Sequence, residues 1–346
     1  MTMLNFRYHV VSLVAVFLAL AIGVVLGAGP LQRPLSDSLA GQLTEAREAR
    51  DDYKAQVGNL EGQIAGYGKA AAALKPDLVN SALTGLQVAV VSLPGAAKED
   101  VEAALGVLGE AGAQVVAQVE VTPAFTDPAT TTYRTTFAGQ LRSYLEPDPG
   151  AQATTEEIFA LALAQVLTSS SEDAVTVAAL LQGTDTPFIT ASVQPAAAAH
   201  SVLVIGPRNQ DSLATALGNP DADTLKRHTG NLVALSIGLG QAGSGGAVVA
   251  DATGEQSLLA KVRASGQAVS TLDGVGTEFT TVFIPRVLAA SIAGKHGAYG
   301  ASPSATEGMP VAVALPPLPD VGTSVLAGAG TAPAAPTPAP SDAPAP

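Results

Sequence analysis

Residues able to bind a metal ion or start a reaction are few in this sequence. It contains four histidines and no cysteine, and no two histidines stand at the i, i+4 spacing that places two ligands on one helix face. His9 borders an apolar run, where we expect an interfacial position. His200 precedes an apolar segment and His228 lies in the polar start of a predicted helix, so we expect a surface or capping role for both. His296, in "GKHGAYG", either acts as a cation at a helix end or as a ligand with partners distant in sequence.

Methionine adds no clear metal site to these histidines. Copper(I) prefers the sulfur atoms of cysteine and methionine, and Met1, Met3 and Met309 do not form a cluster along the chain. The residues alone therefore predict no metal-ligating side chain.

A glycine pattern resembles a nucleotide site by letter. Gly238, Gly240 and Gly243 match G-x-G-x-x-G. That motif binds a pyrophosphate when a strand precedes it and a helix follows it, whereas here a helix-like segment precedes it and a strand-like segment follows. No GxSxG, HExxH or P-loop pattern occurs. We predict that the protein is not an enzyme and has no catalytic or cofactor-binding residue.

Two carboxylates follow predicted strands. Asp251 ends "GAVVAD" and Asp273 ends "VSTLD". Ligands often bind at the carboxyl ends of parallel strands, but aspartate is also a preferred turn residue. We expect each aspartate to lie in a solvated turn, with ligand binding as the alternative.

The first element that positions these residues is an apolar segment near the N-terminus. No charged residue occurs from Tyr8 to Gln32, and about 20 apolar residues span a bilayer as a helix. We predict a retained membrane anchor at residues 10–29, with cleavage near Gly27-Ala28-Gly29 as the alternative. The short basic front predicts that residues 1–9 are cytoplasmic and the bulk of the chain lies outside.

One face of the predicted anchor carries small residues four apart: Ala15, Ala19, Gly23 and Gly27. This spacing extends the GxxxG pattern, which lets two helices approach closely in lipid. It indicates a dimer face, although alanine and glycine are common throughout this chain.

A heptad pattern follows the anchor. Leu39, Ala46, Tyr53, Leu60 and Tyr67 are seven apart, and apolar residues recur four positions after most of them. This alternation predicts a coiled-coil stalk over residues 35–75 that forms a parallel homodimer, with Pro76 ending the helix. The alternative is an amphipathic helix packed on its own domain.

The rest of the chain alternates apolar strands and amphipathic helices. "LQVAVVSLPG" (86–95), a helix over 98–112 and "AQVVAQVEV" (113–121) form a predicted βαβ unit. Thr154 and Glu157 form a capping box before another helix. We predict a mainly parallel-sheet α/β domain over residues 83–315, whose last or edge strand is 268–276.

The net charge of the chain limits the kinds of partner that it can bind. The net charge is −13, which argues against nucleic acid as a partner.

Residues 327–346 are almost entirely Ala, Pro, Thr and Ser, so we predict a disordered, extended tail. The fold class is thus α/β, with one N-terminal transmembrane helix and a coiled-coil stalk before the domain.

Several of these segments resemble one protein family. "RYHVVSLVAVFLALAIGVVLGAGPLQRPLSDSL" (7–39), "LQVAVVSLPGA" (86–96), "VSTLDGVGT" (269–277) and "IAGKHGAYG" (292–300) resemble the MctB family of mycobacterial copper-transport envelope proteins. The resemblance implies a role in copper homeostasis or transport at the cell membrane and envelope, with copper as the one metal to consider. The chain is also similar to a partner of a septal protein that controls a cell-wall hydrolase.

Two functions remain open from the sequence. The first is a non-enzymatic, membrane-anchored envelope protein acting in copper homeostasis, which the resemblance implies. The alternative is a coiled-coil scaffold at the septum that engages an envelope or division protein controlling cell-wall hydrolysis. Continuously apolar strands separated by helices do not predict the alternating strands of a membrane barrel.

Overall fold

The computed structural model describes residues 3–27, 32–182, 187–191 and 197–321. The chain divides into two units, Met1–Gly66 and Tyr67–Pro346, which are described separately. The predicted tail at 327–346 and the alternative cleavage site at Ala28-Gly29 lie outside the described residues.

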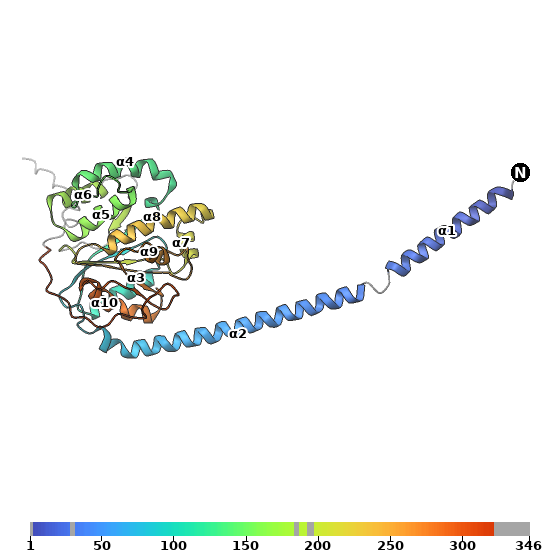
Figure 1. Ribbon diagram of the computed structural model, residues 1–346, viewed down its shortest axis with the longest axis horizontal. Coiled ribbons are helices and arrows are strands. Elements are labelled where there is room, and N and C mark those ends of the chain that lie inside the picture. Colours follow the sequence, from blue (N-terminus) through green and yellow to red (C-terminus); the bar gives the residue numbers. More distant parts are fainter. Residues whose placement is uncertain (1–2, 28–31, 183–186, 192–196, 322–346) are drawn as a thin grey trace, which may run out of the picture. The chain divides into compact units, whose positions relative to one another are not determined.

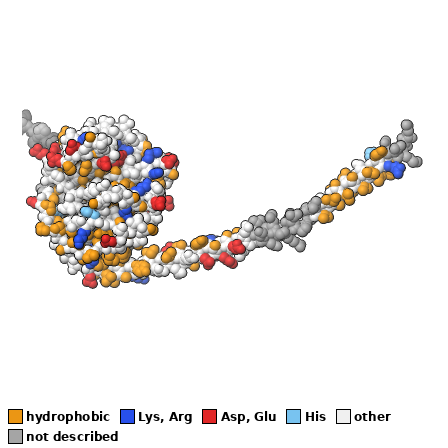
Figure 2. Space-filling model, in the orientation of Figure 1, with side chains coloured by type: hydrophobic (Ala, Val, Ile, Leu, Met, Phe, Trp, Pro, Cys, Tyr) orange, Lys and Arg blue, Asp and Glu red, His pale blue; other side chains and the backbone are white. Residues whose placement is uncertain are grey.

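The first unit is helical. Helix α1, Met3–Gly27, contains the segment Phe6–Val25, which in the described part of the chain is the one helix long and apolar enough to cross a membrane. Figure 2 shows hydrophobic side chains along α1. Helix α2, Gln32–Val79, follows and continues into the second unit.

Helix α2 does not end at Pro76 as predicted. It runs to Val79, and the N–H of Asn80 donates to the carbonyl of Pro76 at 3.2 Å. A proline inside a helix removes one backbone hydrogen bond, but Ala71 and Val79 are buried in the core of the second unit. That burial continues the helix past the proline.

The second unit is built on a seven-stranded sheet of described residues, in the order β3-β2-β1-β4-β5-β6-β7. Neighbouring strands are parallel, except that β3 is antiparallel to β2. The mainly parallel α/β sheet predicted from the sequence is confirmed. The strands are β1 Gln87–Ser92, β2 Gln114–Val121, β3 Ile189–Ala191, β4 Ser201–Ile205, β5 Ala247–Ala250, β6 Ser270–Asp273 and β7 Ala298–Tyr299.

Helices cover the two faces of this sheet (Figure 1). One face is covered by α4 (Thr131–Leu141), α5 (Thr155–Thr168), α6 (Glu172–Gln182), α8 (Ala222–Gly240) and α9 (Leu258–Ala264). The other face is covered by α3 (Lys98–Glu110), α10 (Glu278–Ile292) and the end of α2. Because both faces are buried, strands such as β4 and β5 are apolar without alternation.

Most predicted elements are present, including the βαβ unit β1-α3-β2 and the capping box of α5, where Thr154 and Glu157 bond reciprocally. The segment 268–276 is not the edge of the sheet. Its strand β6 lies between β5 and β7, because the loop "GKHGAYG" adds the short strand β7 outside it.

Candidate functional site

The carboxyl ends of β1, β4, β5 and β6 meet at one edge of the sheet, because these strands are parallel. Ligands of doubly wound folds bind at this edge, at the point where the strand order reverses. Here that point lies between β1 and β4. The loops that meet there are 93–97, 206–209 and 274–277.

The protein's own backbone packs against the first of these loops. Gly95, after β1, has a left-handed φ of 82°. A Cβ atom at this position would lie 2.9 Å from the carbonyl oxygen of Ser212 and from Cα of Leu213. The loop backbone therefore presses directly on helix α7, Gln210–Ala216, where a nucleotide-binding loop would leave space for its ligand.

An ion pair joins the loop after β4 to the first turn of α3. Arg208, after β4, donates through Nε and Nη2 to the two carboxylate oxygens of Asp100 at 2.8 and 2.7 Å. The hydrogen bond that Arg208 donates to Asp100 raises the pKa of Arg208. Gly276, after β6, lies under this guanidinium, since a Cβ there would approach Nε to 2.7 Å. The loops after β4 and β6 and the first turn of α3 thereby meet around one arginine.

A second ion pair is buried at the end of β6. Nη1 of Arg263 lies 3.0 Å from Oδ2 of Asp273, and both side chains are under one-tenth exposed. Arg263 also donates to the carbonyl of Tyr299 at 2.7 Å and to the hydroxyls of Ser302 and Ser304. The group binds β6 and α9 to the segment after β7.

Asp273 is satisfied on every side. It accepts hydrogen bonds from the N–H of Ala301 at 2.8 Å and the hydroxyl of Ser302 at 2.5 Å. Burial alone would raise the pKa of Asp273, but the hydrogen bonds from Ser302, Ala301 and Arg263 hold it below its usual value. Gly300 has a φ of 132°, and any Cβ there would collide with this carboxylate.

The two predicted turn aspartates are therefore not solvated. Both Asp251 and Asp273 are 5% exposed. Asp251 accepts from the N–H and the hydroxyl of Thr253 at 2.8 and 2.6 Å. The loop that follows β5 folds back over Asp251, whereas Arg263 and the segment after β7 cover Asp273.

His200 is buried, contrary to the surface role expected from the sequence. Its Nδ1 accepts from the N–H of Gln87 at 3.1 Å, and its Nε2 lies 2.8 Å from the carbonyl oxygen of Pro319. Because a carbonyl can only accept, Nε2 carries the proton. The ring links the amino ends of β1 and β4 to the segment 309–321.

His228, on α8, is also buried rather than at the surface, with 5% exposure. Its Nδ1 has no hydrogen-bond partner among the described residues. Burial lowers the pKa of His228; Asp127 opposes this, and Arg134 and Arg227 reinforce it. His296 is exposed, with Nδ1 3.5 Å from the hydroxyl of Ser291.

We expect His228 to weaken the fold in mild acid. Its lowered pKa means that the unfolded chain binds a proton more readily, so the free energy of unfolding falls as pH drops below 6.5, the ordinary histidine value. The loss levels off below the folded-state pKa. In His228→Gln this contribution is missing, so urea unfolding between about pH 7 and pH 5 should show a shallower decline than wild type. Equal declines in the two proteins would contradict the assignment.

The glycine pattern serves packing. Gly238 and Gly240 lie within α8, and added Cβ atoms would come within 2.5 Å of Ala160 on α5 and of Val269. Gly243 has a φ of 64° and presses on the carbonyl of His200. No group of three His, Cys, Asp or Glu residues that could hold a metal ion occurs in the described ranges.

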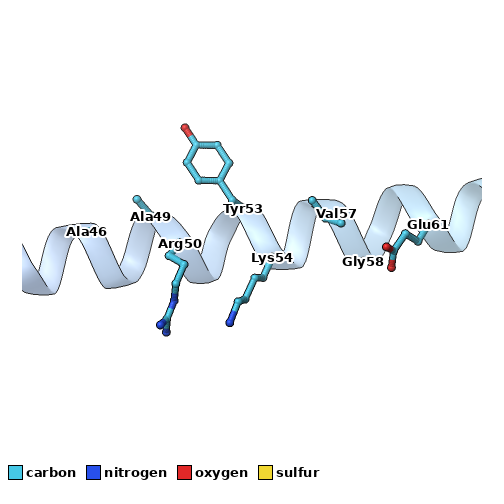
Figure 3. Close-up of a pocket in the computed structure, with 8 residues that line it drawn as sticks. All are labelled: Ala46, Ala49, Arg50, Tyr53, Lys54, Val57, Gly58 and Glu61. Carbon is cyan, nitrogen blue, oxygen red and sulfur yellow. The ribbon is translucent and has the colours of Figure 1, made fainter. Parts of the chain in front are cut away.

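The last candidate surface is in the first unit. Five large apolar side chains of α2 that lie within this unit are more than half exposed, and we name them the α2 stripe: Leu43, Tyr53, Val57, Leu60 and Ile64. Figure 3 shows Tyr53 and Val57 projecting from one side of the helix, and all the residues labelled there belong to α2. The stripe is an open helical face.

Together these observations define a doubly wound α/β domain that follows a long exposed helix and an apolar helix able to span a membrane. The chain matches the family described as "Copper transport outer membrane protein, MctB" over residues 3–310. It belongs to the MctB family.

Individual relatives agree with this family. Proteins named "Copper transporter MctB" from Mycobacterium tuberculosis and Mycobacterium bovis are 33% identical over 135 residues, which cover 36% of this chain and 40% of the relative. The protein of the same name from Mycobacterium leprae is 32% identical over 146 residues, covering 37% and 41%. The chain thus spans about two fifths of the length of the curated relatives it matches.

Proposed function

We propose that this chain is a non-enzymatic, membrane-anchored envelope protein that acts in copper homeostasis. The observation that carries the proposal is the family match over residues 3–310, together with relatives named copper transporters. The apolar segment Phe6–Val25 supports anchoring. Arg7 in an acid-free front supports a cytoplasmic N-terminus and an extracytoplasmic domain.

The test is cell-associated copper in a strain that lacks the gene. After a modest copper challenge, we expect several-fold more copper than in the parent strain and a return to the parent level on complementation. Zinc and iron measured in the same samples serve as controls for general envelope damage. Equal copper in the two strains would overturn the proposal.

We further propose that α2 pairs with α2 of a second copy as a parallel coiled coil. The α2 stripe supplies the apolar seam, and two chains anchored with the same topology must run parallel. In such a pair, residues at the g positions of one helix face residues at the e positions of its partner. The g positions hold Gln42, Ala49, Gln56 and Gln63, so the charged Arg47, Lys54 and Glu61 meet no like charge there.

Leu60→Asp is expected to break this pairing. The substitution places a carboxylate in the middle of the seam, so self-association of the full chain in detergent should weaken by at least about tenfold. Sedimentation velocity over a concentration series measures the loss. Asn59→Asp adds the same charge one residue away, off the seam, and should leave association unchanged. A monomeric wild-type chain would count against the coiled coil.

A second candidate function is a scaffold at the septum that engages a partner controlling cell-wall hydrolysis. The α2 stripe favours it, since an exposed apolar helix face suits a helical partner. Normal cell separation in a strain that lacks the gene, with septal proteins in their usual positions, would exclude this function. Delayed separation that Leu60→Asp reproduces would support it.

A further inference from the structure

A groove of about 450 Å³ lies at the carboxyl ends of β1 and β2, beside α3. In the parallel pair β1–β2, Val90 is opposite Gln118 and Ser92 is opposite Glu120, so these four side chains point to the same face of the sheet. On this face α3 packs over β1, but the chain after β2 crosses to the opposite face to form α4, α5 and α6. The outer part of β2 therefore forms an open floor.

The wall opposite this floor is one side of α3. Lys98 and Glu102 are four residues apart and lie on the same side of the helix, with Val101 and Leu105 between and beyond them. Both apolar residues are half-buried, whereas Lys98, Glu102 and Glu120 are exposed. The groove thus combines an aliphatic surface with charges on its α3 wall and on its β2 floor.

Among the described residues, these three charges, on Lys98, Glu102 and Glu120, have no ion-pair partner. Asp100, on the same helix, differs because both its oxygens are bound by Arg208. A ligand with complementary charges would supply these three groups with ion-pair partners.

We propose that this groove binds a short zwitterionic peptide of two or three residues. Its ammonium group lies between Glu102 and Glu120, and its carboxylate faces Lys98. An aliphatic side chain covers Val101 and Leu105. The volume falls within the range of about 300–1,000 Å³ typical of small-ligand sites.

The first turn of α3 disfavours the ligand class usual for this fold. A nucleotide places phosphate at the N-terminus of the first helix, but the first turn of α3 carries Glu99 and Asp100. Those carboxylates repel phosphate and already satisfy the positive helix end. The peptide proposal is independent of the copper proposal, because it uses neither a metal ligand nor the α2 stripe.

The test is calorimetric titration of the full chain in detergent with the dipeptide alanyl-leucine, its N-acetyl form and its C-terminal amide. We expect saturable binding of the free dipeptide. Each capped form should bind about tenfold or more weakly, since each loses one charge-assisted contact. Absence of saturable binding by the free dipeptide, or equal binding of all three forms, would overturn the proposal.

Substitutions assign the contacts. Glu120→Gln should weaken binding of the free dipeptide about tenfold and reduce the effect of N-acetylation, because it removes one of the two carboxylates that face the ammonium group. Lys98→Gln should abolish the effect of amidation. Glu255→Gln removes an exposed carboxylate from the loop after β5 and should change nothing. A free dipeptide that binds Glu120→Gln as tightly as wild type would show that the groove is not the site.

Discussion

Asp273→Asn is expected to lower the free energy of unfolding by about 3–5 kcal/mol, the usual effect of breaking a buried ion pair from one side. The substitution keeps the shape of the side chain but leaves Arg263 charged and 7% exposed without its carboxylate. The amide also presents N–H groups where Ala301 N–H and the Ser302 hydroxyl now donate. Both effects act on the same cluster, which ties β6 to the segment after β7.

Urea unfolding followed by circular dichroism measures this loss. Glu110→Gln is the matched control, because Glu110 pairs with Lys75 at 2.9 Å at the surface, with side chains 52% and 27% exposed. Exposed pairs contribute about 0–1 kcal/mol. Similar losses in the two variants would contradict the view that the Arg263–Asp273 pair is a structural centre of the domain.

Phe188→Ala is expected to cost about 3–5 kcal/mol, the range for deleting a fully buried aromatic ring. Phe188 is 0% exposed, and its ring centroid lies 5.2–6.1 Å from those of Phe159, Tyr133 and Phe137. These rings come from α4 and α5, so Phe188 is where the outer helical layer meets the start of β3. Its removal leaves a cavity that three neighbouring rings border.

Phe279→Ala provides the comparison for Phe188→Ala. Phe279, on α10, is only half-buried and contacts one ring, that of Phe283, at 4.7 Å. Because less apolar surface is lost, the cost should be clearly smaller. The midpoints of thermal unfolding of the two variants, recorded side by side, check the order. A larger loss in Phe279→Ala would show that the α4–α5 layer contributes less to stability than its packing indicates.

The central part of the fold could be predicted because its signals are local. An apolar run, a charged amphipathic segment and a second apolar run specify β1, α3 and β2 wherever the rest of the chain lies. The outer strands gave no such signal. β3 and β7 have three and two residues, too few for a period to show, and β6 was therefore placed at the edge instead of inside the sheet.

The chemistry at the carboxyl edge could not be predicted in the same way. Asp273 follows a strand and resembles any turn aspartate, but its partners stand 10 and 29 residues away, at Arg263 and Ser302. His200 is buried by Pro319, which is 119 residues distant. Contacts between residues so far apart along the chain leave no recognisable pattern in a single sequence.

The end of α2 illustrates a different limit. Pro76 is a strong local signal for a helix end, and tertiary packing overrides it through Ala71 and Val79. The heptad pattern of the same helix places five apolar side chains in an exposed row, but no pattern in one chain fixes what covers that row. The coiled coil accordingly remains a prediction.

The short outer strands affect how readily copies of the domain can aggregate through their sheet edges. A sheet recruits foreign strands through long free edges, and here β3 presents three residues and β7 only two, with Tyr299 already bridged to Glu307 on its outer side. Copies of the domain that collide thus find little template at these two described edges for growing ribbons or fibrils.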